Sequence, residues 1–362
     1  MKNSPDTVVP TETPSSADPR ADRGGSIASV MESRGPRGAG ELVRGIGLAG
    51  TIAAAAMGIQ TLPGLALFSP LIISMVAGLA VRNLIGMPDR VKSGVTFAMR
   101  KILRVAIALL GFQLTTTQVL ALGASGIVVI TTTLAAAFLF TIWLGRVLRV
   151  ERKLAELIAA GTSICGASAV IAVNAITDAG DEDIAYAVAC VTVFGSLAML
   201  VYPLLPELLR LNPHAYGLWS GASIHEIAQV VAATFQHDRT AGEFGTIAKL
   251  TRVMMLAPVV LIMGALVKRR KATQEGTSPP VPLFVLGFVA LVALNSSVAV
   301  PASAKMLIVT GTTYLLAVAL AAMGLETDVA KLRAKGLRPL LLGAGASLFI
   351  ATFSLALVKL TA

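Results

Sequence analysis

The sequence predicts an all-α polytopic membrane protein with about 11 transmembrane helices in two inverted five-helix repeats. Apolar residues make up 55% of the chain and charged residues only 14%, and the mean hydropathy is +0.77. Soluble domains carry about 25% charged residues. Apolar segments long enough to cross about 30 Å of hydrocarbon recur along the chain. The composition therefore excludes a soluble fold.

The N-terminal residues 1–41 differ from the rest, because they are rich in proline, serine and mixed charges. They are expected to form a disordered cytoplasmic tail, and they lack the apolar core of a cleavable signal peptide. An extra transmembrane helix is expected in 42–65, one repeat in 66–206 and the second in 207–362. The approximate limits of the eleven expected spans are 43–61, 66–86, 100–119, 124–145, 154–177, 183–205, 215–235, 245–267, 282–299, 303–325 and 337–359.

The basic residues predict the orientation, because cytoplasmic loops collect lysine and arginine. With eleven spans, 25 of the 30 basic residues fall on the side of the tail. These 25 lie in the tail as far as Arg44, in 82–104, in 146–153, at Arg210, in 268–271 and in 331–338. We expect a cytoplasmic N-terminus and an external C-terminus, with the acidic loop 178–183 outside. The charge of +10 then reports topology, and no nucleic-acid partner is expected.

Two short matches indicate the repeat. Lys249-x-x-Arg252 precedes an apolar run, as Lys101-x-x-Arg104 does 148 residues earlier. At an offset of 150 residues, Gly161-Thr-Ser matches Gly311-Thr-Thr. Both pairs join spans that lie five segments apart, which gives opposite orientations in the membrane, as in many secondary transporters.

Glycines and hydroxyls in the fifth span predict a helix that breaks near the middle of the membrane. Exposed N–H groups and the positive end of a half-helix would suit an anion there. A second break is expected near Gly311, and a packing face between continuous helices is the alternative. The candidate substrate-binding residues in these two spans are Gly161, Thr162, Ser163, Cys165, Gly166, Ser168, Asn174, Gly311, Thr312 and Thr313.

The seventh span carries Ser223 as a further substrate-binding candidate, and His225, Glu226 and Gln229 as proton-coupling candidates. A carboxylate in the membrane usually faces a cavity, pairs with a cation or carries a proton. A buried pair that locks two helices is the alternative for Glu226, and a hydrogen-bonded core histidine is the alternative for His225. The pattern H-E-x-x-H of zinc proteases fails, because Gln229 stands at the second ligand position.

The cations most suited to an anionic substrate are Lys249, Arg252 and Lys305, since they fall outside the basic loops. The alternative is snorkelling to the external interface, and Arg252 is also a candidate partner of Glu226. Cys165 and Cys190 lack a CxxC spacing and are expected to be apolar packers.

The runs Gly161–Val170 and Ser220–Val230 resemble the YeiH-type inner-membrane family, which is described as a family of sulfate exporters. Lys249-x-x-Arg252 before Ala257-Pro258, and Gly324-Leu-Glu-Thr-Asp328, resemble the same family. The resemblance covers about residues 43–360. It implies two inverted repeats with broken crossing helices, as in the wider group of bile-acid and cation/proton transporters. It also implies export of sulfate, sulfite or a small organosulfonate.

The leading hypothesis is a secondary transporter of a small anion, coupled to protons through Glu226 and His225. The sequence has no G-x-x-x-x-G-K-[ST] motif, so the energy is expected to come from a gradient. A cation/proton antiporter and a membrane-embedded enzyme using Ser163 are the alternatives. No cofactor or metal is expected. The expected location is a bacterial-type inner membrane, and the expected partners are the anion and lipid, with a homodimer left open.

Overall fold

The computed structural model describes residues 36–60, 69–268, 283–298, 301–330 and 335–361, which form helices joined by short connections. The chain has two units, Met1–Gly40 and Glu41–Ala362. Within the first unit only the start of helix α2 (Pro36–Ile59) is described, so the expected disordered tail lies almost wholly outside the described residues. The second unit holds the candidate site.

After α2, the second unit continues with helices that are extended by π or 3-10 turns. Ser69 starts the first of them, because its Oγ accepts a hydrogen bond from Leu71 N at 3.2 Å and a proline follows it. These elements are α3 (Pro70–Ala80), η1 (Val81–Ile85), α4 (Asp89–Phe97), η2 (Ala98–Ile102), α5 (Leu103–Leu110), η3 (Gly111–Gln113), α6 (Thr116–Leu120) and α7 (Gly123–Val147).

The elements from residue 152 onward contain two interrupted segments. Asn212 caps one of them through a hydrogen bond from Ala215 N at 2.8 Å. The elements are α8 (Arg152–Ser163), α9 (Ala167–Thr177), α10 (Asp181–Val201), η4 (Tyr202–Leu204), α11 (Pro206–Leu209), α12 (Pro213–Ser223), α13 (Ile227–His237), α14 (Arg239–Met254), α15 (Leu256–Lys268), α16 (Leu283–Ser297), α17 (Ala302–Glu326) and α19 (Leu337–Thr361).

Each of the eleven expected spans corresponds to a helix or to consecutive helices of the structure. Among the described residues, six helical stretches are long and apolar enough to cross a membrane unbroken. They are Ala39–Ile59, Gly123–Val147, Asp181–Leu204, Arg239–Gly264, Ser303–Glu326 and Leu337–Thr361. The number of crossings in the whole chain stays a prediction, and two of the eleven expected spans have a different form.

Helices α8 and α9 form a re-entrant hairpin, here called hairpin 1. If they were collinear, Lys153 and Asp178 would lie about 37 Å apart at 1.5 Å per residue. Instead, Lys153 Nζ donates a hydrogen bond to Asp178 O, and Thr177 Oγ1 donates one to Glu156 Oε2 at 3.4 Å. The arms pack closely, since a Cβ added at Gly161 would lie 2.8 Å from Val170 Cγ2. The expected span 154–177 therefore turns back at residues 164–166.

Helices α12 and α13 form a second hairpin, hairpin 2, by the same criterion. Tyr216 Oη in α12 donates to Ala233 O in α13 at 3.2 Å. The rings of Tyr216 and His237 lie 5.1 Å apart, although collinear helices would separate these residues by about 31 Å. The expected span 215–235 therefore turns back at residues 224–226.

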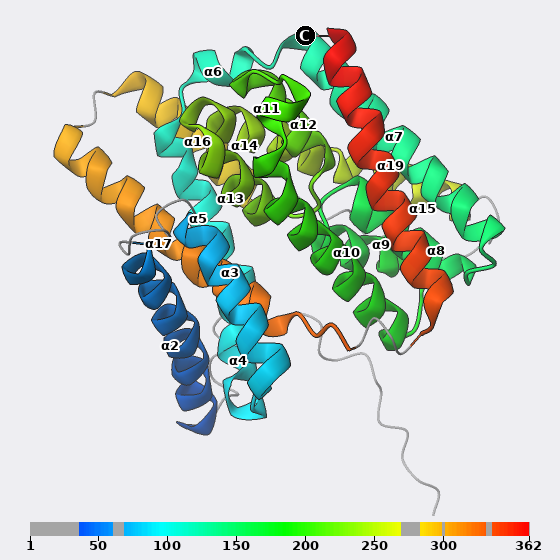
Figure 1. The fold of residues 1–362 in the computed structure, drawn as a ribbon, viewed down its shortest axis with the longest axis horizontal. Helices are drawn as coiled ribbons and strands as arrows, with labels where there is room; N and C mark the ends of the chain where they lie inside the picture. The colour runs from blue at the N-terminus through cyan, green and yellow to red at the C-terminus, as the bar shows by residue number, and fades with distance from the viewer. Residues whose placement is uncertain (1–35, 61–68, 269–282, 299–300, 331–334, 362) are drawn as a thin grey trace, which may run out of the picture. The chain divides into compact units, whose positions relative to one another are not determined.

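The two hairpins correspond to each other at an offset of 60 residues. The first arms end at Ser163 and Ser223, and the second arms begin at Ala167 and Ile227. Helix α10 connects the base of hairpin 1 to the base of hairpin 2, which separates the two bases by about 30 Å. The hairpins therefore enter the molecule from opposite ends, and α8 and α9 lie below α12 and α13 in Figure 1.

This arrangement corrects two expectations about the loops. Lys335, in the predicted cytoplasmic cluster 331–338, pairs with Asp183. The acidic loop 178–183, which was expected outside, therefore lies on the side of that basic cluster. Arg210 follows α10, which begins beside Lys335, so it lies at the opposite end, where it lines a surface depression together with Lys359. The parity argument was wrong for both loops, because a hairpin returns the chain to the side from which it entered.

The expected break near Gly311 is absent from the structure. Helix α17 runs without interruption from Ala302 to Glu326. The hydroxyls of Thr312 and Thr313 donate to Ile308 O and Val309 O, one turn earlier in the same helix. The partner of the break in hairpin 1 is the break in hairpin 2, so the expected pairing of 161–163 with 311–313 was wrong.

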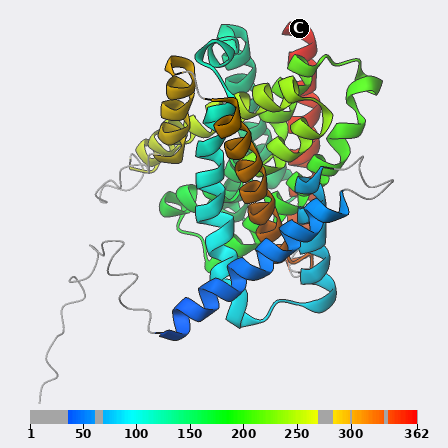
Figure 2. The same ribbon diagram turned by 90° about the vertical axis from the view of Figure 1, so that its left-hand side faces the viewer.

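The remaining helices form two neighbouring groups. Helices α7, α10, α14 and α19 pack against the hairpins, whereas α17 packs along α3 and α5, and α16 packs against α5 (Figures 1 and 2). Helix α13 contacts α3 and α17 as well as α14. One arm of hairpin 2 therefore joins the two groups.

Candidate functional site

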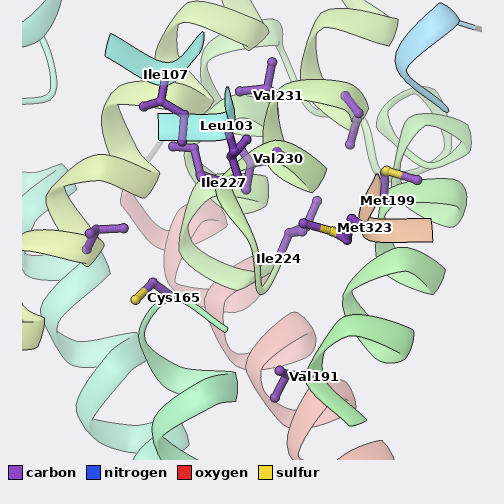
Figure 3. Packing of buried hydrophobic residues seen from close by; sticks show 14 of the residues in the cluster. Leu103, Ile107, Cys165, Val191, Met199, Ile224, Ile227, Val230, Val231 and Met323 are labelled. Carbon is purple, nitrogen blue, oxygen red and sulfur yellow. The ribbon is translucent and has the colours of Figure 1, made fainter. Parts of the chain in front are cut away.

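The tips of the two hairpins meet inside the protein. Glu226, in the tip of hairpin 2, accepts a hydrogen bond at Oε1 from Ala167 N, the first residue of α9, at 2.7 Å. Cys165 and Ile224 are buried at the two tips (Figure 3). The negative side chain lies at the N-terminus of α9, where the helix dipole favours an anion.

Glycines bring α14 against hairpin 2. A Cβ added at Gly221 would lie 2.7 Å from Gly245 O, and one added at Gly217 would lie 2.9 Å from Gly245 N. Small residues permit such close approach between membrane helices. Lys249 and Arg252, one and two turns further along α14, are fully buried and reach both tips.

Lys249 uses its three N–H donors on backbone carbonyls of both hairpins. Its Nζ donates to Ile164 O at 3.0 Å, to Ile224 O at 2.9 Å and to His225 O at 2.5 Å. These carbonyls follow the ends of α8 and α12, where the helix dipole is negative and a cation is stabilising. Lys249 therefore neutralises two half-helix ends at the same time.

Arg252 completes this arrangement from the next turn of α14. Its Nε donates to Ser163 O at 2.6 Å, its Nη2 donates to Thr162 O, and its Nη1 donates to Ile224 O at 3.0 Å. Among the residues that the structure describes, Arg252 forms no ion pair with Glu226. The predicted ion pair between Glu226 and Arg252 is thus not formed. Both side chains lie at the tips, where each bonds to backbone groups.

The formal charge of the tips is positive. Two cations and one carboxylate are buried together, and neither Lys249 nor Arg252 has a carboxylate oxygen within 4.0 Å in the described parts of the chain. Buried charge is costly unless it is paired. Part of this charge is balanced by the carbonyl dipoles, and the remainder favours a bound anion.

Gln229 and His225 support Glu226 in different ways. Gln229 Oε1 accepts from Glu226 N at 3.0 Å, and Gln229 Nε2 donates to Thr192 O at 3.1 Å and to Ser196 Oγ at 3.2 Å. His225 Nε2 lies 3.2 Å from Ser347 Oγ, and its buried Nδ1 has no hydrogen-bond partner in the described ranges. Gln229 therefore orients the tip, whereas His225 retains an unused nitrogen.

The other predicted residues divide into those at the tips and those away from them. Gly161, Thr162, Ser163, Cys165, Gly166, Ser168 and Ser223 lie at or within a turn or two of the tips. Ser168 is exposed, whereas Ser163 Oγ is buried without a partner in the described chain. Asn174 instead accepts from Ala179 N at 2.9 Å near the hairpin base. Gly311, Thr312 and Thr313 lie in α17, about three turns from Met323, whose Sδ is 3.9 Å from Gln229 Nε2.

Sequence reasoning missed the residues of α10 and α19 that complete the site. Thr192, Gly195 and Ser196 hold Gln229, and a Cβ added at Gly195 would lie 2.1 Å from Gln229 Oε1. Ser347 faces His225. A Gly-Ser pair inside an apolar span was the available signal at 195–196, while nothing in the local sequence distinguishes Ser347.

The family model described as conserved hypothetical protein 698 matches residues 44–343. The chain belongs to this family. A UPF0324 membrane protein of Corynebacterium glutamicum is 39% identical over 298 residues, which cover 81% of this chain and 86% of the relative. The UPF0324 inner membrane protein YeiH of Escherichia coli K12 is 36% identical over 310 residues, covering 83% and 88%.

A UPF0324 membrane protein of Bacillus cereus is 34% identical over 318 residues, covering 87% of this chain and 94% of the relative. The predicted resemblance to YeiH-type proteins is therefore confirmed. The matched region of this UPF0324 family member includes both hairpins and α14. Together with the helical architecture, these relatives identify a multi-pass membrane protein.

Proposed function

We propose that this protein is a secondary transporter of a small anion and that the hairpin tips are its substrate site. One observation carries the proposal: two half-helix pairs from opposite ends meet at two buried cations and one carboxylate. Interrupted helices at the membrane midplane are the usual means by which secondary transporters present backbone dipoles to an ion or substrate. The formal excess of positive charge selects an anion.

Sulfate, sulfite or a small organosulfonate is the proposed cargo, and export is the proposed direction. Lys249 and Arg252 would attract the anion through their positive charge and without direct hydrogen bonds, since the N–H groups described above already donate to backbone carbonyls. Glu226 is the proposed proton carrier, because it is the carboxylate at the tips of the described structure. His225 is its proposed partner in proton transfer.

The site favours an anion over the two alternatives. A cation/proton antiporter binds its ion with carboxylates, whereas the tips carry two cations beside Glu226. An enzyme with a serine nucleophile needs a base within hydrogen-bond reach. Ser163 Oγ forms no hydrogen bond with His225 or Glu226 in the described structure.

Flux into proteoliposomes tests the proposal. Radiolabelled sulfate and sulfite are offered with and without a proton gradient, and the wild-type rate is compared with that of empty vesicles. We expect Lys249→Met to reduce the flux at least tenfold and Glu226→Gln to remove its dependence on the gradient. Lys359→Met, at the exposed end of α19, is the matched charge control. Wild-type flux equal to that of empty vesicles for both anions would contradict the proposed cargo.

A further inference from the structure

The side chain of Glu226 occupies a position that has the features of an anion site. It belongs to hairpin 2, yet its Oε1 accepts from Ala167 N at the start of α9 in hairpin 1. Helix α9 has 11 residues, which is long enough for a substantial dipole. The first half-helix thus receives its anion from the opposite hairpin.

The backbone at Gly166 leaves room for this carboxylate. Gly166 has φ +69°, which an L side chain rarely adopts, and a Cβ there would lie 2.0 Å from Glu226 Oε1 and 2.4 Å from its Cδ. Gly166 is also the residue that corresponds to Glu226 at the offset of 60. One tip is therefore hollowed at the position where the other tip carries the carboxylate.

The charge of the site is a second and independent observation. Lys249 contacts carbonyls of both hairpin tips, yet no carboxylate lies within 4.0 Å of its Nζ in the described structure. The single carboxylate of Glu226 is therefore the negative charge that balances two buried cations and the positive end of the α9 dipole. An external anion at the tips would meet the Ala167 N–H group and a positive potential that Glu226 balances only in part.

We propose that Glu226 is a tethered ligand, and that the substrate binds by displacing its carboxylate from the N-terminus of α9. This inference rests on the proposed function and narrows the substrate class. The cargo presents a head group with at least two charged oxygens, as a carboxylate, sulfite or sulfonate does. A halide or a cation does not reproduce the geometry of the displaced group.

Chemical rescue tests this assignment without measuring transport. Glu226→Ala is purified in detergent as the full chain, and its thermal stability is titrated with formate, methanesulfonate and chloride at constant ionic strength. We expect formate and methanesulfonate to stabilise the variant saturably with a Kd in the millimolar range, and chloride to have no such effect. The Glu226 carboxylate is held beside Ala167 N, so its effective concentration exceeds the millimolar value of a short flexible linker, and the wild type should need at least several-fold more formate.

Two variants control for general effects of charge. Glu226→Ala combined with Gly166→Ala should lose the rescue, because the new methyl group fills the position of the carboxylate oxygen. Glu243→Ala also removes a largely buried carboxylate, but one that pairs with Arg239 away from the tips, and formate should not rescue it. Equal stabilisation of all variants, or of the wild type and Glu226→Ala, would overturn the proposal.

A further variant covers the case in which Glu226→Ala does not fold. Glu226→Gln keeps the side-chain volume and leaves a neutral oxygen near Ala167 N. Formate should bind this variant at least several-fold more tightly than the wild type, and adding Gly166→Ala should abolish the gain. An affinity equal to that of the wild type refutes displacement. If the anions rescue the variant but the wild type shows no flux, the transport function is refuted and the anion site stands. If the wild type shows flux but the variant is not rescued, displacement of Glu226 is refuted and the transport function stands.

Discussion

Removing the guanidinium of Arg252 should destabilise the protein more than removing any surface charge. Arg252→Met leaves the carbonyls of Thr162 and Ser163 without these hydrogen bonds, while Ile224 O keeps only the one from Lys249 Nζ. A buried unsatisfied acceptor costs about 1–3 kcal/mol, and hydrogen bonds inside membrane proteins average about 0.6 kcal/mol with a maximum near 1.7. We therefore expect a loss of about 3 kcal/mol. Arg252→Lys keeps the charge without the fork and should lose about half as much.

Fluorescence of Trp219 provides the assay. Trp219 stacks on Tyr202 with ring centroids 4.0 Å apart, and its Nε1 donates to Ala351 O at 2.8 Å, so it reports on hairpin 2 and its neighbours. The other tryptophan, Trp143, is exposed and is replaced by phenylalanine in the background. Equilibrium unfolding in mixed micelles then gives the free energy of unfolding for each variant.

Arg239→Met is the matched control on the same helix. Arg239 has a side chain that is 69% exposed and forms one ion pair with Glu243, so its loss should cost less than about 1 kcal/mol. If Arg252→Met cost no more than Arg239→Met, Arg252 would not be holding the hairpin carbonyls. An equal loss for Arg252→Met and Arg252→Lys would show that the fork geometry rather than the charge holds them.

Three glycine substitutions give further tests. Gly195→Ala places a Cβ 2.1 Å from Gln229 Oε1 and should lower the free energy of unfolding by about 1–3 kcal/mol; no change would contradict the packing of α10 on hairpin 2. Gly180→Cys, without the native cysteines, should react with an impermeant maleimide only from the side that labels Lys92→Cys. Labelling from the other side would refute hairpin 1 as re-entrant. Gly311→Ala meets no atom within 4 Å in a continuous helix, so unfolding measurements should show no loss and up to about 1 kcal/mol of gain. A clear loss would indicate a break there.

The helices were predictable from the sequence, but the way in which two of them turn back was not. Each hairpin joins two apolar arms of 11 or 12 residues, and together these have the length and hydropathy of one span. Hydropathy cannot distinguish the two forms, because both bury the same apolar side chains. The charges of the acidic loop 178–183 did not reveal on which side of the membrane it lies, since acidic residues contribute little to orientation.

The candidate site was predictable where an ionisable group stood in an apolar span. Glu226, Lys249 and Arg252 were recognised for that reason, because an intramembrane charge needs a partner. Their partners were missed, because they are backbone groups that almost any residue type supplies: carbonyls for Lys249 and Arg252, and the Ala167 N–H group for Glu226. The pairing of the two helix breaks was misjudged for a related reason. The match of Gly161 with Gly311 used three common residues, whereas the offset of 60 becomes visible only from where the helices end.

The position of Lys249 and Arg252 couples the hairpins mechanically. Each side chain bonds to both tips, so if α14 stays with hairpin 2, parting the tips breaks the bonds to Thr162, Ser163 and Ile164 together. At the value of about 1 kcal/mol per hydrogen bond expected above for Arg252, that opening costs about 3 kcal/mol. The separated state is then populated at about 1% or less. Because the three bonds break together, the tips would separate in a single step.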